Sequence, residues 1–134
     1  MKQSSFRYLG ALILLIVGAF LAAFGVDTLG SPQVGLLLSA GVAAVAAGSL
    51  AELSVGPVAV PWRWFAAVTY VLLGVLQPAG LLPPLVAGSA SAAEAALFVV
   101  SCLGAAALLF FAVDVARGGG HVDITPDVER VVGR

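Results

Sequence analysis

The sequence is short of charged side chains and of the residue types that usually carry chemistry. Only 10% of its 134 residues are charged, whereas soluble domains average about 25%. It has one cysteine, one histidine and no asparagine. A single cysteine excludes an intramolecular disulfide and a C-x-x-C redox motif. With six basic and seven acidic residues, the net charge of −1 leaves no basic surface for nucleic acid.

Apolar side chains are what the sequence has in abundance. Hydrophobic residues make up 61% of the chain, and the mean hydropathy is +1.12. A soluble domain of this length cannot bury so much apolar surface, because small domains keep a large share of their surface exposed. We therefore expect an all-α integral membrane protein, and not a soluble enzyme or a disordered chain.

The spacing of the charged residues predicts four membrane-spanning helices arranged as a bundle. A helix needs about 17–25 apolar residues to cross a bilayer. Four uncharged stretches are long enough for one such helix and too short for two, which predicts spans at about 8–26, 34–51, 62–82 and 92–116. A signal peptide is the alternative for the first stretch, but its apolar run exceeds the usual length of about 7–15 residues. We expect this helix to be retained.

The end of the third span allows two interpretations. Gln77, Pro78 and Gly80 interrupt the apolar stretch. In one interpretation the helix continues to about Leu82 with a kink at Pro78. In the other it ends near Gln77 and leaves residues 78–86 as an apolar loop at the membrane interface.

Local signals mark both ends of the fourth span. Ser91 and Glu94 have the spacing of a capping box, in which each side chain accepts from an amide of the first turn. The three glycines at 118–120 predict the end of the helix, because glycine readily leaves helical geometry. The chain therefore divides into a membrane domain over 1–117 and a short polar tail over 118–134.

The tail carries a signal of its own. Thr125 followed by Pro126 is typical of a helix start. We expect a short helix over about 126–132 that lies on the membrane surface through its valines.

The distribution of the basic residues predicts the orientation of the helices. With four spans, every lysine and arginine falls on one side of the membrane, which is the cytoplasmic side by the positive-inside rule. The loops on the other side hold only Asp27 and Glu94. We therefore expect a multi-pass protein of the cell (cytoplasmic) membrane, with both termini on the cytoplasmic side. The basic residues are Lys2, Arg7, Arg63, Arg117, Arg130 and Arg134.

Small residues indicate where the helices pack, because close backbone approach holds helices together in lipid. The second span is rich in them, and Gly41, Ala44 and Gly48 are the residues we expect at its contacts; Gly104 has this role in the fourth span. This pattern predicts that the second span is central and contacts the fourth. The alternative is that alanine is simply abundant, in a composition typical of a prokaryotic protein.

Four polar side chains are candidates for a functional role. Glu52 follows the second span and is placed to pair with Arg63 across a short loop. Gln77 lies beside the proline that interrupts the third span. Asp114 lies near the end of the fourth span, three residues before Arg117, a spacing that also suits an ordinary pair on one helix face. The ordinary alternative for each carboxylate is contact with water at the membrane interface.

No catalytic, cofactor-binding or metal-binding residues are expected. His121 is followed by Asp123, Asp127 and Glu129, but one histidine with carboxylates in a tail is a weak pattern for a metal site. Cys102 is expected to be a small apolar side chain.

These features favour a non-catalytic membrane protein. We expect an accessory or assembly subunit, or a self-associating bundle, whose partners are the lipid bilayer and a larger membrane protein or further copies of itself. The alternative is a small oligomeric channel or transporter, because interrupted helices often line transport sites. The helix count is similar to that of the small multidrug-resistance transporters, but these depend on a glutamate within the first helix, and residues 8–26 contain none.

Overall fold

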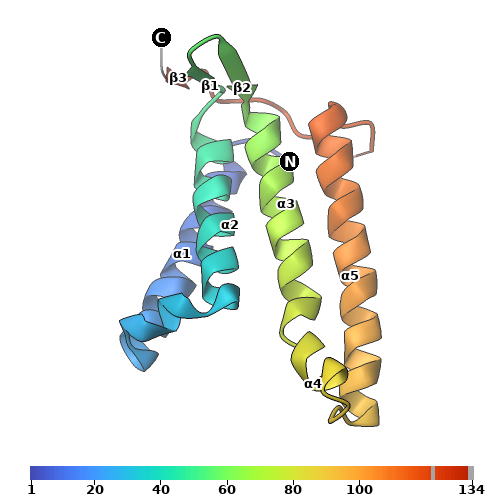
Figure 1. Cartoon of the computed structure of the whole chain (residues 1–134). Coiled ribbons are helices and arrows are strands. Elements are labelled where there is room, and N and C mark those ends of the chain that lie inside the picture. Colours follow the sequence, from blue (N-terminus) through green and yellow to red (C-terminus); the bar gives the residue numbers. More distant parts are fainter. Residues whose placement is uncertain (122, 133–134) are drawn as a thin grey trace.

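The computed structural model describes residues 1–121 and 123–132 and is mostly helical (Figure 1). Four long helices run roughly side by side, and the ends of the chain come together with a small sheet at one end of them. The long helices are α1 (Ser5–Phe24), α2 (Pro32–Ser49), α3 (Trp62–Ala79) and α5 (Ala92–Arg117). The short elements are the 3-10 helix η1 (Val26–Gly30), helix α4 (Leu82–Val86) and strands β1 (Glu52–Val55), β2 (Val58–Pro61) and β3 (Val131–Val132).

The four long helices make a row. Helix α1 packs against α2, α2 against α3, and α3 against α5. Helix α2 therefore has a long helix on each side. The expected contact between α2 and α5 is wrong, because α5 packs along α3 instead. The row leaves α1 and α5 at its two edges (Figure 1).

Three of the described helices are long and apolar enough to cross a membrane. They are α1, α2 and α5, with mean hydropathies of 2.1, 1.4 and 2.6 over their most apolar windows. Helix α3 has the same length as α2 but contains an arginine and two tryptophans, which α2 lacks and which lower its hydropathy. Many large apolar side chains on the four helices are exposed, among them Leu15, Phe24, Val100 and Leu103.

Glycines bring α1 and α2 into backbone contact. A Cβ atom added to Gly10 would lie 2.6 Å from the amide nitrogen of Val45, and one added to Gly41 would lie 2.9 Å from Leu14 Cδ2. A Cβ atom on Gly48 would collide with the backbone of Phe6 and Arg7. Ala44 is fully buried in the same helix. Three of the residues that the small-residue pattern selected therefore lie buried in α2, and both of the glycines among them face α1.

A β-hairpin with a two-residue turn connects α2 to α3. Strands β1 and β2 pair in antiparallel register, with Val55 opposite Val58. Gly56 opens the turn at a φ of +59°, and the tight loops of two-residue hairpins require such a positive φ. The sequence showed only that this segment is too short to cross a membrane.

The tail does not form the surface helix expected over 126–132. Val131 and Val132 form strand β3 instead, which pairs in parallel with Glu52 and Leu53 of β1. The expectation was wrong because the edge of β1 offers unpaired amide and carbonyl groups, and β-branched valines suit a strand better than a helix.

Helix α3 ends between the two positions considered for it. Pro78 lies in its last turn, the helix stops at Ala79, and the separate short helix α4 begins at Leu82. The two predicted ends of α5 are confirmed. Ser91 and Glu94 form the full capping box, and Gly118 ends the helix at a left-handed φ of +113°.

The α1–α2 contact yields a test with an internal control. Replacing Gly48 by alanine forces a methyl group into the backbone of α1, so we expect a loss of about 1–3 kcal/mol in the free energy of unfolding, as for other overpacked sites. Gly35 lies in the same helix and has nothing within 4 Å of the added atom, so Gly35→Ala should be neutral or slightly stabilising. Unfolding by SDS in mixed micelles measures both variants, and equal stability of the two would contradict the close packing.

Candidate functional site at the charged end

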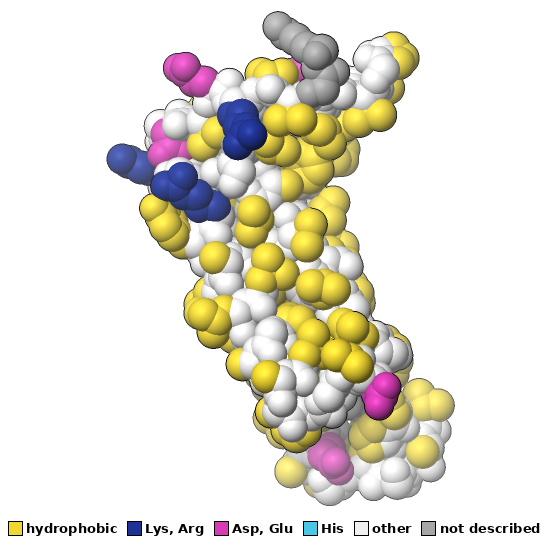
Figure 2. Space-filling model, turned by 90° about the vertical axis from the view of Figure 1, so that its left-hand side faces the viewer, with side chains coloured by type: hydrophobic (Ala, Val, Ile, Leu, Met, Phe, Trp, Pro, Cys, Tyr) yellow, Lys and Arg dark blue, Asp and Glu magenta, His cyan; other side chains and the backbone are white. Residues whose placement is uncertain are grey.

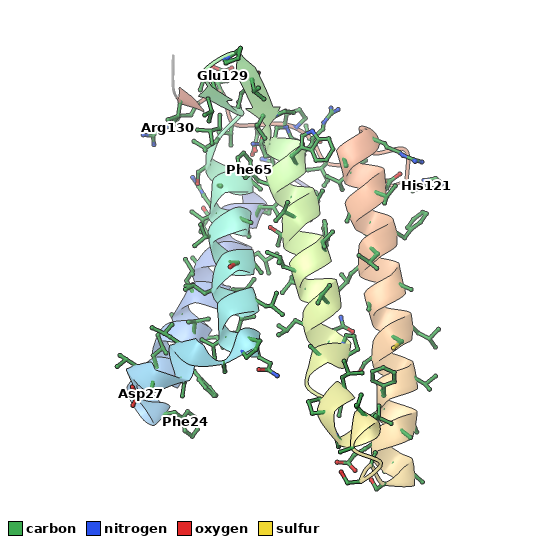
Figure 3. The ribbon with its side chains drawn as sticks, in the orientation of Figure 1. Phe24, Asp27, Phe65, His121, Glu129 and Arg130 are labelled. Carbon is green, nitrogen blue, oxygen red and sulfur yellow. The ribbon has the colours of Figure 1, made fainter. Side chains whose placement is uncertain are left out.

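The charged end of the molecule is built from three segments that are distant in sequence. The first residues of the chain, the β1–β2 hairpin and the tail after α5 all meet there (Figure 1). On the face shown in Figure 2, the lysine and arginine side chains gather at this end, whereas acidic side chains lie at both ends. Asp27 lies at the far end of α1 (Figure 3).

Backbone hydrogen bonds join the tail to the first residues. The ammonium group of Met1 donates to the carbonyl of Asp123 at 3.0 Å. The amide of Thr125 donates to the carbonyl of Met1 at 2.9 Å, and the amide of Gln3 donates to the carbonyl of Thr125 at 3.0 Å. Further along, the carbonyl of Arg130 accepts from the amide of Ala51 at 2.8 Å. The tail therefore crosses from the start of α1 to the hairpin.

Asp127 fixes the tail to the start of α1. Its carboxylate accepts from the amide of Ser4 at 2.8 Å and from the Ser4 hydroxyl at 2.6 Å. Ser4 is the residue before the first turn of α1, where unpaired amides and the helix dipole favour a negative charge. The hydrogen bonds from the Ser4 hydroxyl and amide hold the pKa of Asp127 below its ordinary value.

Gln3 caps the C-terminal end of α2. Its side-chain amide donates to the carbonyls of Ala47 and Leu50 at 2.9 and 2.8 Å. These carbonyls lie at the end of α2, where the helix itself supplies no donors. Gln3 is fully buried, and its side-chain carbonyl has no hydrogen-bond partner among the described residues.

A compact apolar cluster lies beneath these polar contacts. It contains Phe6, Ala47, Trp62, Ala66 and Val115, and so joins all four long helices. Trp62 is only 7% exposed. It therefore packs in this core, whereas Tyr8 and Trp64 are exposed.

Asp114 organises the turn after α5. Its carboxylate accepts from the amide of Gly120 at 3.1 Å and of His121 at 3.1 Å, and it lies 3.0 Å from His121 Nδ1. Asp114 is 9% exposed, whereas His121 is 73% exposed and its ring meets that of Phe110 at 5.5 Å. These contacts join the last turn of α5 to the turn that follows it.

The expected pair of Glu52 and Arg63 is absent from the described part of the chain. Glu52 lies in β1 opposite Pro61 and accepts from the Ser54 hydroxyl at 3.3 Å. The Arg63 guanidinium lies 6.0 Å from the centre of the Trp62 ring. It also lines a cavity of about 40 Å³ with Gly118 and Asp123, large enough for a single water molecule.

Gln77 and Gly104 meet at the contact between α3 and α5. A Cβ atom on Gly104 would collide with the side-chain carbonyl oxygen of Gln77. Two residues that the sequence selected for different reasons are therefore neighbours, and the glycine makes room for the amide.

The arrangement at the charged end is suited to holding segments together. Its carboxylates accept from backbone amides and hydroxyls, and the residues described contain no cluster of three histidine, cysteine or acidic side chains that could hold a metal ion. Sequence reasoning missed Gln3, Ser4 and the contact role of Asp127. No local pattern announces them, because their partners lie 44 to 123 positions away.

Comparison with known proteins gives a family but no described activity. A family model matches residues 1–128, which include all four long helices and most of the tail. The chain belongs to DUF7994, a family of unknown function. No curated protein and no solved structure gives a significant match. The match of DUF7994 extends through Asp127, so the contact with Ser4 lies within it.

The Asp127 contact predicts a pH-dependent tail. Because the folded pKa of Asp127 lies below its unfolded value, the carboxylate stabilises the closed tail at pH above the ordinary aspartate range. This stabilisation is lost as the pH falls through the lowered pKa. Asp127→Asn should lower the protection of the Gln3 and Thr125 amides against hydrogen exchange near neutral pH, measured relative to the intrinsic exchange rate at each pH. It should also reduce the loss of this protection on acidification.

Glu129→Gln is the matched control, because Glu129 (labelled in Figure 3) is an exposed acid of the same tail. Its side chain has no hydrogen bond among the described residues. Exchange rates in Asp127→Asn that equal those of the unmodified chain at every pH would show that this carboxylate does not hold the tail.

Gln3 gives a prediction about stability. Replacing it by alanine leaves the carbonyls of Ala47 and Leu50 without their donor, so we expect a loss of about 1–3 kcal/mol in the free energy of unfolding. Gln33→Ala, at the more exposed start of α2, should change it by less than about 0.5 kcal/mol. The same SDS titration measures both variants, and an unchanged midpoint for Gln3→Ala would refute this role.

Proposed function

We propose that this DUF7994 chain is a small, non-catalytic, multi-pass membrane protein with four spanning helices and both ends in the cytoplasm. Helices α1, α2 and α5 have the required length and hydropathy. Helix α3 packs between α2 and α5, and its 18 residues extend about 27 Å, close to the thickness of a bilayer core. A helix held between two spanning helices shares their environment.

The orientation follows from the two ends of the helix row. The N-terminus, the tail and the gathered cations lie at one end, and Asp27 lies at the other (Figures 1, 2 and 3). Lysine and arginine are enriched on the cytoplasmic side of membrane proteins. This separation of charge is the observation that carries the proposed topology.

Within the membrane we propose that the protein acts by association, as an accessory or assembly subunit or as a self-associating bundle. The row of helices leaves open the side of α2 next to α3, where Leu38, Val42, Ala46 and Phe65 border a hollow of about 430 Å³. The polar groups at the charged end already serve as hydrogen-bond partners within the chain. Both features suit a protein that presents surfaces to other helices.

Cysteine accessibility tests the topology. In a Cys102→Ser background, Asp27→Cys and Val58→Cys place single thiols at opposite ends of the helix row, both at exposed positions. A membrane-impermeant thiol reagent added to intact cells should label position 27 and spare position 58 until the cells are opened. Labelling of position 58 in intact cells would overturn the orientation, and release of the protein by alkaline carbonate would overturn the membrane assignment.

Affinity isolation in mild detergent tests the role. A C-terminally tagged copy should bring down a larger membrane protein in fixed stoichiometry, or further copies of itself. If the tagged protein is recovered only with further copies of itself, as a defined oligomer, the next measurement is flux across reconstituted vesicles. Flux that depends on Gln77 would favour the channel or transporter over the accessory role.

A further inference from the structure

A hollow with entirely apolar walls lies between α3 and α5, beside the short helix α4. Its volume is about 320 Å³, and nine residues line it. Gly74, Pro78 and Ala79 form one wall, and Phe98, Cys102 and Ala105 form the other. No charged or hydrogen-bonding side chain other than the Cys102 thiol borders it.

Small side chains and the end of α3 create this hollow. A Cβ atom on Gly74 would meet the carbonyl oxygen of Ala105 at 3.4 Å and Leu108 Cβ at 3.5 Å, which are ordinary contact distances. Helices α3 and α5 are therefore in ordinary van der Waals contact at Gly74, whereas the backbones of α1 and α2 approach much more closely at Gly48. Beyond Gly74, Pro78 and Ala79 end the helix, and no large side chain fills the space.

The size and chemistry of the hollow limit what can occupy it. Ligand pockets have volumes of about 300–1,000 Å³ and use a few polar groups to orient the ligand. Here the volume reaches that range and the polar groups are missing, which excludes a polar ligand. A stable contact with a second protein copy takes about 20–30 residues on each side, so the nine lining residues are too few to hold one by themselves. An empty hollow loses dispersion contacts on every wall.

We propose that this hollow binds one hydrocarbon chain of a bilayer phospholipid. The inference rests on the proposed membrane location of α3 and α5. An acyl chain needs no polar partner, reaches the hollow from the surrounding bilayer, and restores the missing contacts along its length. Leu82 and Leu109 line the hollow and leave this volume open.

The experiment compares the unmodified chain with two variants of neighbouring residues on α5. Cys102→Phe places a ring in the hollow, whereas Leu103→Phe adds a ring at a position that is 68% exposed and does not border it. Each protein is purified in mild detergent, exchanged into a lipid-free micelle, and examined by native mass spectrometry for co-purified phospholipid.

We expect the unmodified chain and Leu103→Phe to retain one phospholipid. Cys102→Phe should retain about tenfold less, the effect of removing roughly two methylene groups from apolar contact. Equal retention by Cys102→Phe and the unmodified chain would overturn the proposal, as would equal loss in both variants. A protein that resists carbonate extraction but retains no lipid overturns this proposal alone, whereas one that carbonate releases overturns the proposed function.

The native cysteine provides a second measurement that needs no filled variant. In the delipidated unmodified protein, added phosphatidylcholine should slow alkylation of Cys102 about tenfold. In a Cys102→Ser, Leu103→Cys variant, the thiol at position 103 should react at a rate that lipid changes far less. Equal slowing at both positions would show general coating by lipid and not occupation of the hollow.

Discussion

The amide and carbonyl groups at helix ends have no partners within the helix, and the architecture of this chain depends on how they are satisfied. Asp127 accepts from the start of α1, and Gln3 donates to the end of α2. Ser91 and Glu94 cap the start of α5, and the turn beyond its end bonds to Asp114. Two of these four solutions are local in sequence, namely those at α5. The other two join segments that are far apart: Asp127 holds the tail to the start of α1, and Gln3 holds the start of the chain to the end of α2.

The row of helices combines two kinds of contact. Between α1 and α2, glycines bring the backbones together, and an added methyl group has no space at Gly10 or Gly48. Between α3 and α5, Gly104 receives the Gln77 side chain, and an apolar hollow opens beyond Gly74. The first pair is closely packed, while the second leaves an open volume. The cluster around Phe6 and Trp62, which lies near the charged end, contains residues of both pairs.

Sequence reasoning succeeded where the signal is local. The apolar stretches placed the long helices, and the capping box and glycines placed the ends of α5. It failed for the tail, because a strand at Val131–Val132 depends on the open edge of β1, almost 80 positions earlier. It also failed for the order of contacts, because small residues occur on both α2 and α5 and their abundance does not select a neighbour. Gln3 and Ser4 carried no signal, since a polar residue at the start of a chain is ordinary.

The contacts of the tail with residues 1–4 and with β1 have a consequence for biosynthesis. Helices α1 and α2 can pack as soon as both have left the ribosome, because their contact needs no later residue. The carboxylate that accepts from Ser4 is made more than 120 residues after it. Until then the first turn of α1 is uncapped and the edge of β1 is open to pairing with other chains, a known route to aggregation. Only when the tail has been synthesised is the first turn of α1 capped and the edge of β1 protected from pairing with other chains.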